Sequence, residues 1–495
     1  MDNHQQHPQS DSAFMAIEDQ IDERGPILWP SQPAAAATPS TRSRLVLWAL
    51  LSGLAIVVGA FFWRAHLFYQ KNSVSAGAMK LTPPNLRVKP ELQYLNYCGL
   101  DPLRPETYPF IPPLNKEGLE IIQVQAFIRH GDRFFDTGDL CWSGQEHIEY
   151  HCEMTHMSMP NGNLSESSIT PPGRLYRKRF INNRNDFLGN CRVGQLSVKG
   201  YHQESVLGSL FRDAYVNKLL NPVLHAEEVY FRSDDVPRTI LSAESFIGGL
   251  FPSLSTESDS KSEIVDIWSM DFDRETEISN AHECPGLTEQ YNMARTSPAY
   301  VKHEQTVAKA LFEQISFLTG VPADKVPKTQ FDCMMVSACR GTVVPENITP
   351  ELLNRLEQEE KFNFYSLVQY PNRINGTRLA AGPLIREIVE RIELGVSSTS
   401  KVKFSLYSGH DTGPIMLILS ALGCEGEFWA PYASYISIEL YKGGDGQHFV
   451  RVIYNGKAQQ LNGSLSNGLI SFPDFANMMS VFIPSRSECP DVFTV

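Results

Sequence analysis

The sequence predicts an α/β protein in which helices flank a central mixed sheet, with a mostly helical cap subdomain and one preceding transmembrane helix. Three short runs of β-branched and other apolar residues each end in a polar turn before a helical segment, which is the pattern of parallel strands joined by helices. Two further strand-like segments, 434–441 and 448–454, flank a Gly-rich turn and predict an antiparallel hairpin at a sheet edge. Parallel and antiparallel pairs together make the expected sheet mixed.

The N-terminal region divides into a polar tail and an apolar segment. Residues 1–44 are rich in Gln, Ser, Pro and Ala, and we expect them to form a disordered cytoplasmic tail. Residues 45–63 contain no charged side chain, and at ~1.5 Å per residue they nearly span a ~30 Å hydrocarbon core. A buried core helix and a cleaved signal peptide, with Ala76-Gly77-Ala78 as the processing site, are the alternatives. The length of the run and its distance from the N-terminus favour an uncleaved signal anchor.

The chemistry after the apolar run predicts which side of the membrane the main domain occupies. All nine cysteines follow residue 90, and no pair has the CxxC spacing of a metal site. The four N-glycosylation sequons also lie on this side, at Asn163, Asn347, Asn375 and Asn462. Disulfides and N-glycans form in the lumen of the secretory pathway, so we expect a single-pass type II membrane protein with its main domain in the lumen. The short apolar run suits a thin membrane such as that of the Golgi, which is the expected location. Because nine is odd, one cysteine is expected to stay free.

The remaining chain is predicted to be a stem followed by one large domain. Scattered prolines in residues 64–115 predict an extended stem. The domain covers residues 116–490, with cap insertions at about 139–190 and about 255–375. The first insertion contains His147, His151 and His156, which raise the alternative of a metal site. No carboxylate or cysteine pattern accompanies these histidines, so we expect no metal.

The overall charge limits the possible partners. A formal net charge of −13 argues against nucleic acid and against charge-driven binding to anionic lipid. An anionic substrate would therefore need a local basic site.

The segment Glu120–Arg133 supplies such a site. An apolar strand ends here at Arg129, His130 and Arg133, with Gly131 allowing a sharp turn. Two cations beside one imidazole would hold an oxyanion and favour the neutral, nucleophilic form of the ring. The alternative is a surface turn in which the arginines pair with the intervening aspartate.

Two later strand ends repeat this arrangement. The strand at 228–231 leads into RSDDVPRT, which contains Arg232 and Arg238 before a helix. The strand at 403–407 leads into YSGHDTG, which contains His410 and Asp411 before another helix. Strand ends and helix N-termini meet in the crevice where open α/β sheets bind ligands.

The motifs RHGDR, LSVKG, RSDDVPRT and SGHD resemble, in order, those of the histidine acid phosphatases, branch 2 of the histidine phosphatase superfamily. The resemblance implies that His130 forms a phosphohistidine and that Asp411 is the proton donor. It also implies a phosphate site made of Arg129, Arg133, Arg232 and His410, without a metal or other cofactor. Arg238 is interpreted as a structural ion-pair partner of Asp234 or Asp235.

The lead-in QVQAFIRHGDR, the anchor and the terminal VRVIYNG are similar to those of a membrane-anchored member of this family. That likeness implies that the substrate is xylose 2-O-phosphate in the glycosaminoglycan–protein linkage region of proteoglycans. A general acid phosphatase acting on small phosphomonoesters or lipid phosphates is the alternative. A non-catalytic, membrane-anchored glycoprotein that binds through the same fold is the alternative from another class. The oligomeric state and the disulfide pairing stay open.

Overall fold

The computed structural model describes residues 84–153, 181, 184–252 and 265–490. Within these ranges, no helix is long and apolar enough to cross a membrane. The predicted anchor at 45–63 lies outside them, as does the predicted tail at 1–44.

The main sheet has the strand order β3-β5-β2-β6-β7-β8, and β9 pairs with β7. The strands are β2 (Leu119–Arg129), β3 (Val229–Ser233), β5 (Phe404–Gly409), β6 (Tyr435–Gly443), β7 (His448–Tyr454), β8 (Lys457–Ala458) and β9 (Leu469–Ser471). β3, β5 and β2 are parallel, and the remaining pairs are antiparallel, which confirms the predicted mixed sheet. The predicted β6–β7 hairpin forms, but its place at the edge is wrong. β6 lies inside the sheet beside β2, with both faces buried, and β7 pairs further with the short strands β8 and β9.

The register of the parallel strands brings their carboxyl ends to one level. Arg129 at the end of β2 is paired with Gly409 at the end of β5, and Ser408 is paired with Ser233 of β3. The turns that follow the three strands therefore start side by side, which places the three sequence motifs in one region.

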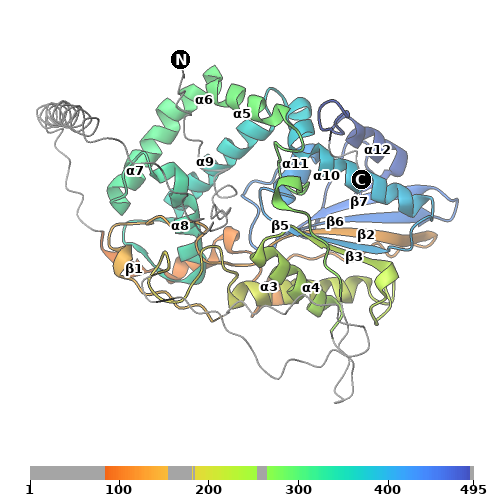
Figure 1. Cartoon of the computed structure of the whole chain (residues 1–495). Helices are drawn as coiled ribbons and strands as arrows, with labels where there is room; N and C mark the ends of the chain where they lie inside the picture. The colour runs from red at the N-terminus through yellow and green to blue at the C-terminus, as the bar shows by residue number, and fades with distance from the viewer. Residues whose placement is uncertain (1–83, 154–180, 182–183, 253–264, 491–495) are drawn as a thin grey trace, which may run out of the picture. The chain divides into compact units, whose positions relative to one another are not determined.

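Helices cover both faces of the sheet (Figure 1). α3 (Val198–Tyr215) and α4 (Pro237–Leu250) lie on one face, and α10 (Arg373–Val396), α11 (Ile415–Leu422) and α12 (Phe472–Ser480) lie on the other. The strand period divides the core accordingly: Val124 and Ala126 pack with α3 and α4, whereas Phe127 packs in the core that contains α10 and α11. α3 and α4 cross closely at Gly208, where a Cβ atom would lie 2.0 Å from the Phe246 carbonyl oxygen.

The second predicted insertion is mostly helical, as expected. It contains α5 (Gly286–Thr296), α6 (Pro298–His303), α7 (Lys309–Thr319), α8 (Val326–Arg340) and α9 (Pro350–Val368), together with the short strand β4 (Val343–Pro345). A π-helical turn at Glu304–Ala308 joins α6 to α7, so the two form one continuous but irregular helix. The buried face of α9 continues through Phe364 and Leu367 near its C-terminus.

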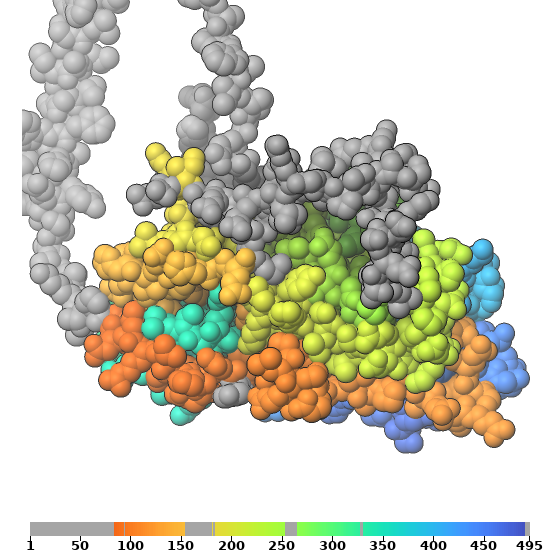
Figure 2. Space-filling model, turned by 90° about the horizontal axis from the view of Figure 1, so that it is seen from below, coloured from red at the N-terminus to blue at the C-terminus, as the bar shows by residue number. Residues whose placement is uncertain are grey.

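The prediction of an extended stem is wrong for residues 84–115, the part of it that the structure describes. Residues 84–115 pack onto the domain: β1 (Leu86–Val88) pairs with β4, and Cys98 forms a disulfide with Cys339 of α8. Figure 2 shows this orange segment against the turquoise atoms of the α8–β4 region. Tyr97 is buried there, and its hydroxyl contacts Arg129. Two of the prolines that suggested a stem instead begin short 3₁₀ helices, Pro90–Tyr94 and Pro105–Thr107.

Three more disulfides join Cys141 to Cys333, Cys152 to Cys191 and Cys284 to Cys489, which leaves Cys424 free. The predicted free cysteine is thus identified, and two of the disulfides hold the first insertion. Asn347, Asn375 and Asn462 are exposed, whereas Asn163 lies outside the described residues. Glycosylation at these sites stays a prediction.

Candidate active site

His130 follows the last residue of β2 and is held by the backbone around it. Its N–H donates to the Gly409 carbonyl at 2.9 Å, so the loops after β2 and β5 are joined directly. Gly131 packs against α3 so closely that a Cβ atom would lie 2.3 Å from the Gly200 carbonyl oxygen. The His130 Nδ1 atom lies 2.8 Å from the Gly131 carbonyl oxygen, which only an Nδ1–H can satisfy. This contact leaves the lone pair on Nε2, the nitrogen available for attack.

The surroundings of His130 keep its ring neutral. The side chain is buried, and burial lowers the pKa of His130 well below its usual value; Arg238, Arg129, His410 and Arg133 lower it further. A neutral imidazole beside cations is a nucleophile that remains unprotonated in acid.

Arg129 is the most enclosed of these cations. One of its terminal nitrogens donates to the Ala430 carbonyl at 2.5 Å, and the other lies 2.7 Å from the Tyr97 hydroxyl and 2.9 Å from Asp411. The guanidinium carbon lies 4.3 Å from the centre of the Tyr432 ring, within range of a cation–π interaction. Its orientation is therefore fixed before any ligand binds.

Arg133 and Arg238 share a carboxylate. Asp136 lies 3.6 Å from Arg133 and 3.2 Å from Arg238, and Asp332 of α8 pairs with Arg133 at 2.7 Å. Burial lowers the pKa of Arg238 and the neighbouring Arg133 lowers it further, although Asp136 opposes this shift. Two guanidiniums held close together by one shared carboxylate are suited to an anion with several oxygens.

Arg232, predicted to bind phosphate, is not brought to this site. Its guanidinium is buried among three carboxylates: Glu387 at 2.5 Å, Glu277 at 3.4 Å, and Glu275 in direct contact. These carboxylates raise the pKa of Arg232 well above its usual value despite the opposing effect of burial. Arg232 lies within β3, and its side chain belongs to a buried ion-pair network.

Arg238 lies beside Asp136 and His410, in the position that was predicted for Arg232. Neither Asp234 nor Asp235, its predicted partners, forms an ion pair with it among the described contacts; Asp136 does. Its Nη2 atom also lies 3.4 Å from His410 Nδ1. The overlooked signal was position, because Arg238 lies in the first turn of α4, at the strand end where ligands bind, whereas Arg232 does not.

The turn after β5 brings His410 and Asp411 to the same place. The His130 and His410 rings are 5.4 Å apart at 78°, and His410 Nε2 lies 2.6 Å from Asp234 Oδ2. Asp411 accepts hydrogen bonds from Trp429 Nε1 at 2.6 Å and from the Thr412 N–H at 2.9 Å. Burial alone would raise the pKa of Asp411, but Arg129 and these two donors outweigh it and lower the pKa.

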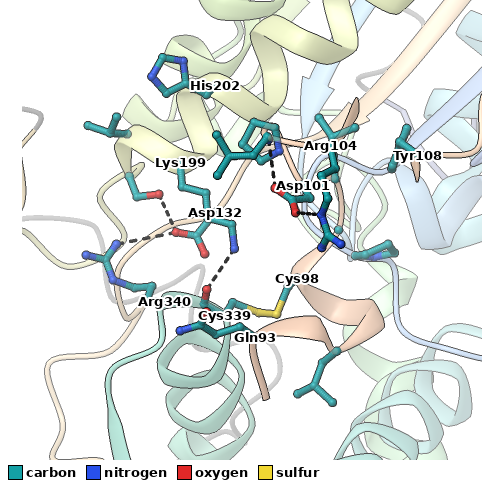
Figure 3. A pocket seen from close by; sticks show the side chains of 18 of the residues that line it. Gln93, Cys98, Asp101, Arg104, Tyr108, Asp132, Lys199, His202, Cys339 and Arg340 are labelled. Atoms are coloured by element: carbon teal, nitrogen blue, oxygen red, sulfur yellow. Dashed lines mark hydrogen bonds and ion pairs between the residues drawn. A yellow bond between two sulfur atoms is a disulfide. The ribbon is translucent and has the colours of Figure 1, made fainter. Parts of the chain in front are cut away.

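A separate cavity of about 900 Å³ lies behind the catalytic loop (Figure 3). Its described lining includes Asp132, Lys199 and Arg340 but none of the residues around His130 Nε2. Asp132 accepts from the Ser197 hydroxyl at 2.5 Å, which ties the loop to the N-terminus of α3. This cavity is distinct from the candidate active site around His130.

Within the described ranges, no group of three or more His, Cys, Asp or Glu side chains has the arrangement of a metal site. His147 and His151 are exposed and lie near Glu146 and Glu149, respectively, whereas His156 is outside the described residues.

Residues 120–455 match the model of the histidine phosphatase superfamily, branch 2, and the chain belongs to this family. It is 29% identical over 388 residues to counting factor 60 of Dictyostelium discoideum, covering 76% of this chain and 90% of that one. It is 27% identical over 280 residues to human lysosomal acid phosphatase, covering 55% of this chain and 65% of the relative. It is 26% identical over 283 residues to rat prostatic acid phosphatase, covering 54% of this chain and 71% of the relative. The apo structure of Hafnia alvei phytase covers 75% of this chain and 98% of its own, at 13% identity and a TM-score of 0.47. The chain is a phosphoric monoester hydrolase of the acid phosphatase type.

Proposed function

We propose that the protein hydrolyses phosphomonoesters through a phosphohistidine intermediate on His130 Nε2. The observation that carries this proposal is the convergence of Arg129, Arg133 and Arg238 around a buried imidazole whose Nδ1 faces a backbone carbonyl. In the first step, Nε2 attacks phosphorus and the ester oxygen leaves. In the second, water attacks phosphorus and releases inorganic phosphate and the histidine. The guanidiniums bind the phosphoryl oxygens, where the negative charge is spread during both steps.

Asp411 is the proposed proton donor to the leaving oxygen. In the free protein its pKa is lowered, chiefly because Arg129 and two hydrogen bonds outweigh burial. A phosphate dianion bound by the same arginines would neutralise part of their charge and raise this pKa, so substrate binding itself favours the protonated acid. His410, held by Asp234, lies next to Arg238 and completes the proposed phosphate site.

The proposed substrate is xylose 2-O-phosphate in the linkage region of proteoglycans, acted on in the Golgi lumen by a membrane-anchored enzyme. The lead-in QVQAFIRHGDR, the terminal VRVIYNG, the apolar run at 45–63 and the sequons support this proposal. A general acid phosphatase is the second candidate, and the names of the lysosomal and prostatic relatives favour it.

A substrate comparison separates the two candidates. The full-length chain is assayed with a phosphoxylose-containing linkage glycan and with p-nitrophenyl phosphate, alongside the His130→Ala variant. We expect a much higher kcat/KM for the glycan, with both activities lost in the variant. Rapid turnover of the aryl ester with an inert glycan would support the general phosphatase instead, and inactivity on both would favour a binding protein.

A further inference from the structure

Beyond the proposed phosphate site, the cap helix α9 is linked to Asp411 through Trp429. Glu357 of α9 accepts a hydrogen bond from the backbone N–H of Trp429 at 2.9 Å, and the centre of the Phe364 ring lies 6.0 Å from that of the Trp429 ring. Trp429 in turn donates through its indole nitrogen to Asp411. Glu360 lies between Glu357 and Phe364, three and four residues away, and therefore shares their face of the helix.

Among the described residues, Glu360 differs from the carboxylates around it because it has no hydrogen-bond or ion-pair partner. Glu359 pairs with His303 at 2.8 Å, Asp332 pairs with Arg133, and Asp411 pairs with Arg129. Among the hydrogen bonds and ion pairs of the described residues, none involves Glu360, although its side chain is only partly exposed. A half-buried carboxyl group without a partner is costly unless a ligand or water completes its hydrogen bonds.

We propose that Glu360 is a specificity-determining residue that hydrogen-bonds a hydroxyl group of the leaving alcohol, next to the ester oxygen that Asp411 protonates. The proposal rests on the phosphatase function proposed above and defines the substrate class as phosphate esters of alcohols with several hydroxyl groups. A hydroxyl both donates and accepts, so it suits a group flanked by acceptors better than a second phosphate does.

The charges around Glu360 define its protonation state. Burial raises the pKa of Glu360 to about 8, and the nearby Glu359, Asp411 and Asp332 raise it in the same direction. At neutral and acidic pH the group is thus a carboxylic acid that donates one hydrogen bond and accepts others. Glutamine reproduces this pattern without titrating, so Glu360→Gln is the matched variant.

The test compares two alkyl esters that both need Asp411 and differ in their hydroxyl groups: glycerol 1-phosphate and n-propyl phosphate. The measured quantity is the ratio of their kcat/KM values for the full-length chain. At about pH 6 we expect Glu360→Ala to lower this ratio by roughly 5- to 10-fold, because one hydrogen bond to the hydroxylated substrate is lost. Glu360→Gln should change it by less than about two-fold, as should Asn354→Ala on the exposed side of α9.

Raising the pH gives a second readout that does not depend on the alanine variant folding. The ratio for the unmodified chain should change as the pH passes about 8, where Glu360 turns from a donor and acceptor into an acceptor only, while the ratio for Glu360→Gln stays constant. An unchanged ratio in Glu360→Ala, or a ratio in the unmodified chain that stays constant through this pH range, would overturn the proposal. Neither result would affect the phosphatase function, which is tested separately by loss of both activities in His130→Ala.

Discussion

Arg232 and Arg238 lie six positions apart in one motif, yet the protein places them in opposite electrostatic surroundings. Arg232 is enclosed by Glu275, Glu277 and Glu387, whereas Arg238 shares the carboxylate of Asp136 with Arg133. The number of carboxylates around a buried arginine therefore separates a structural ion pair from a site that can still attract an anion. Each prediction below tests one side of this comparison.

The largest effect is expected at Arg238. Replacing it with alanine removes a guanidinium from the proposed phosphate site, and kcat/KM for p-nitrophenyl phosphate should fall roughly 100- to 1,000-fold. Asp136 keeps Arg133 as a partner, so thermal unfolding should change little. Activity close to that of the unmodified chain would show that Arg238 does not bind the phosphoryl group.

The next effect concerns the general acid. Asp411→Asn should lower kcat for an alkyl ester by about 10²- to 10⁴-fold, because an alkoxide leaves poorly without a proton. An aryl ester should lose far less, since its phenolate leaves readily. Measuring kcat for glycerol 1-phosphate and p-nitrophenyl phosphate checks this difference, and equal losses on both would remove Asp411 from the role.

Arg232→Ala should lower the free energy of unfolding. The substitution leaves Glu275 and Glu277 buried without their cation, which should cost about 3–5 kcal/mol in the free energy of unfolding. Burial raises the pKa of both glutamates, so the cost should be smaller in acid, where they are protonated, and should grow as the pH rises above about 4.5. Chemical denaturation at several pH values measures this, with Arg355→Ala as an exposed control. A variant as stable as the control would contradict the structural role.

The comparison also explains what the sequence could predict about the site. His130, Arg129, Arg133, His410 and Asp411 come together because they directly follow the carboxyl ends of adjacent parallel strands, and apolar patterning locates such ends. The choice between the two arginines depended on Glu275, Glu277 and Glu387. These come from segments 40 to 160 residues away, whose proximity to β3 no local pattern indicates.

The same limit applies to the fold. The strands and their following helices were predictable from periodicity, but the packing of residues 84–115 depended on long-range links. The pairing of β1 with β4 and the Cys98–Cys339 disulfide join segments about 240 to 260 residues apart. The proline content of this segment carried no information about what it packs against. The position of β6 beside β2 was missed because a hairpin signal fixes the partner strand, not its other neighbour.

The smallest effect is on the acid limb of the pH profile. Because burial and the surrounding cations lower the pKa of His130, kcat/KM for an aryl ester should show no loss centred near pH 6.5 as the pH falls. For Arg238→Ala, the loss of kcat/KM in acid should occur at a higher pH than in the unmodified chain, because one cation that disfavours protonation of His130 is gone. A limb near pH 6.5 in the unmodified chain would show that His130 titrates like an exposed histidine.

The most direct test of the account is to trap the intermediate. The full-length chain is mixed with a ³²P-labelled phosphomonoester, quenched in base to preserve phosphohistidine, and the labelled peptide is sequenced. The account predicts phosphate on Nε2 of His130, with no label in His130→Ala and normal labelling in the control Arg355→Ala. Label on another residue, or continued turnover by His130→Ala, would contradict it.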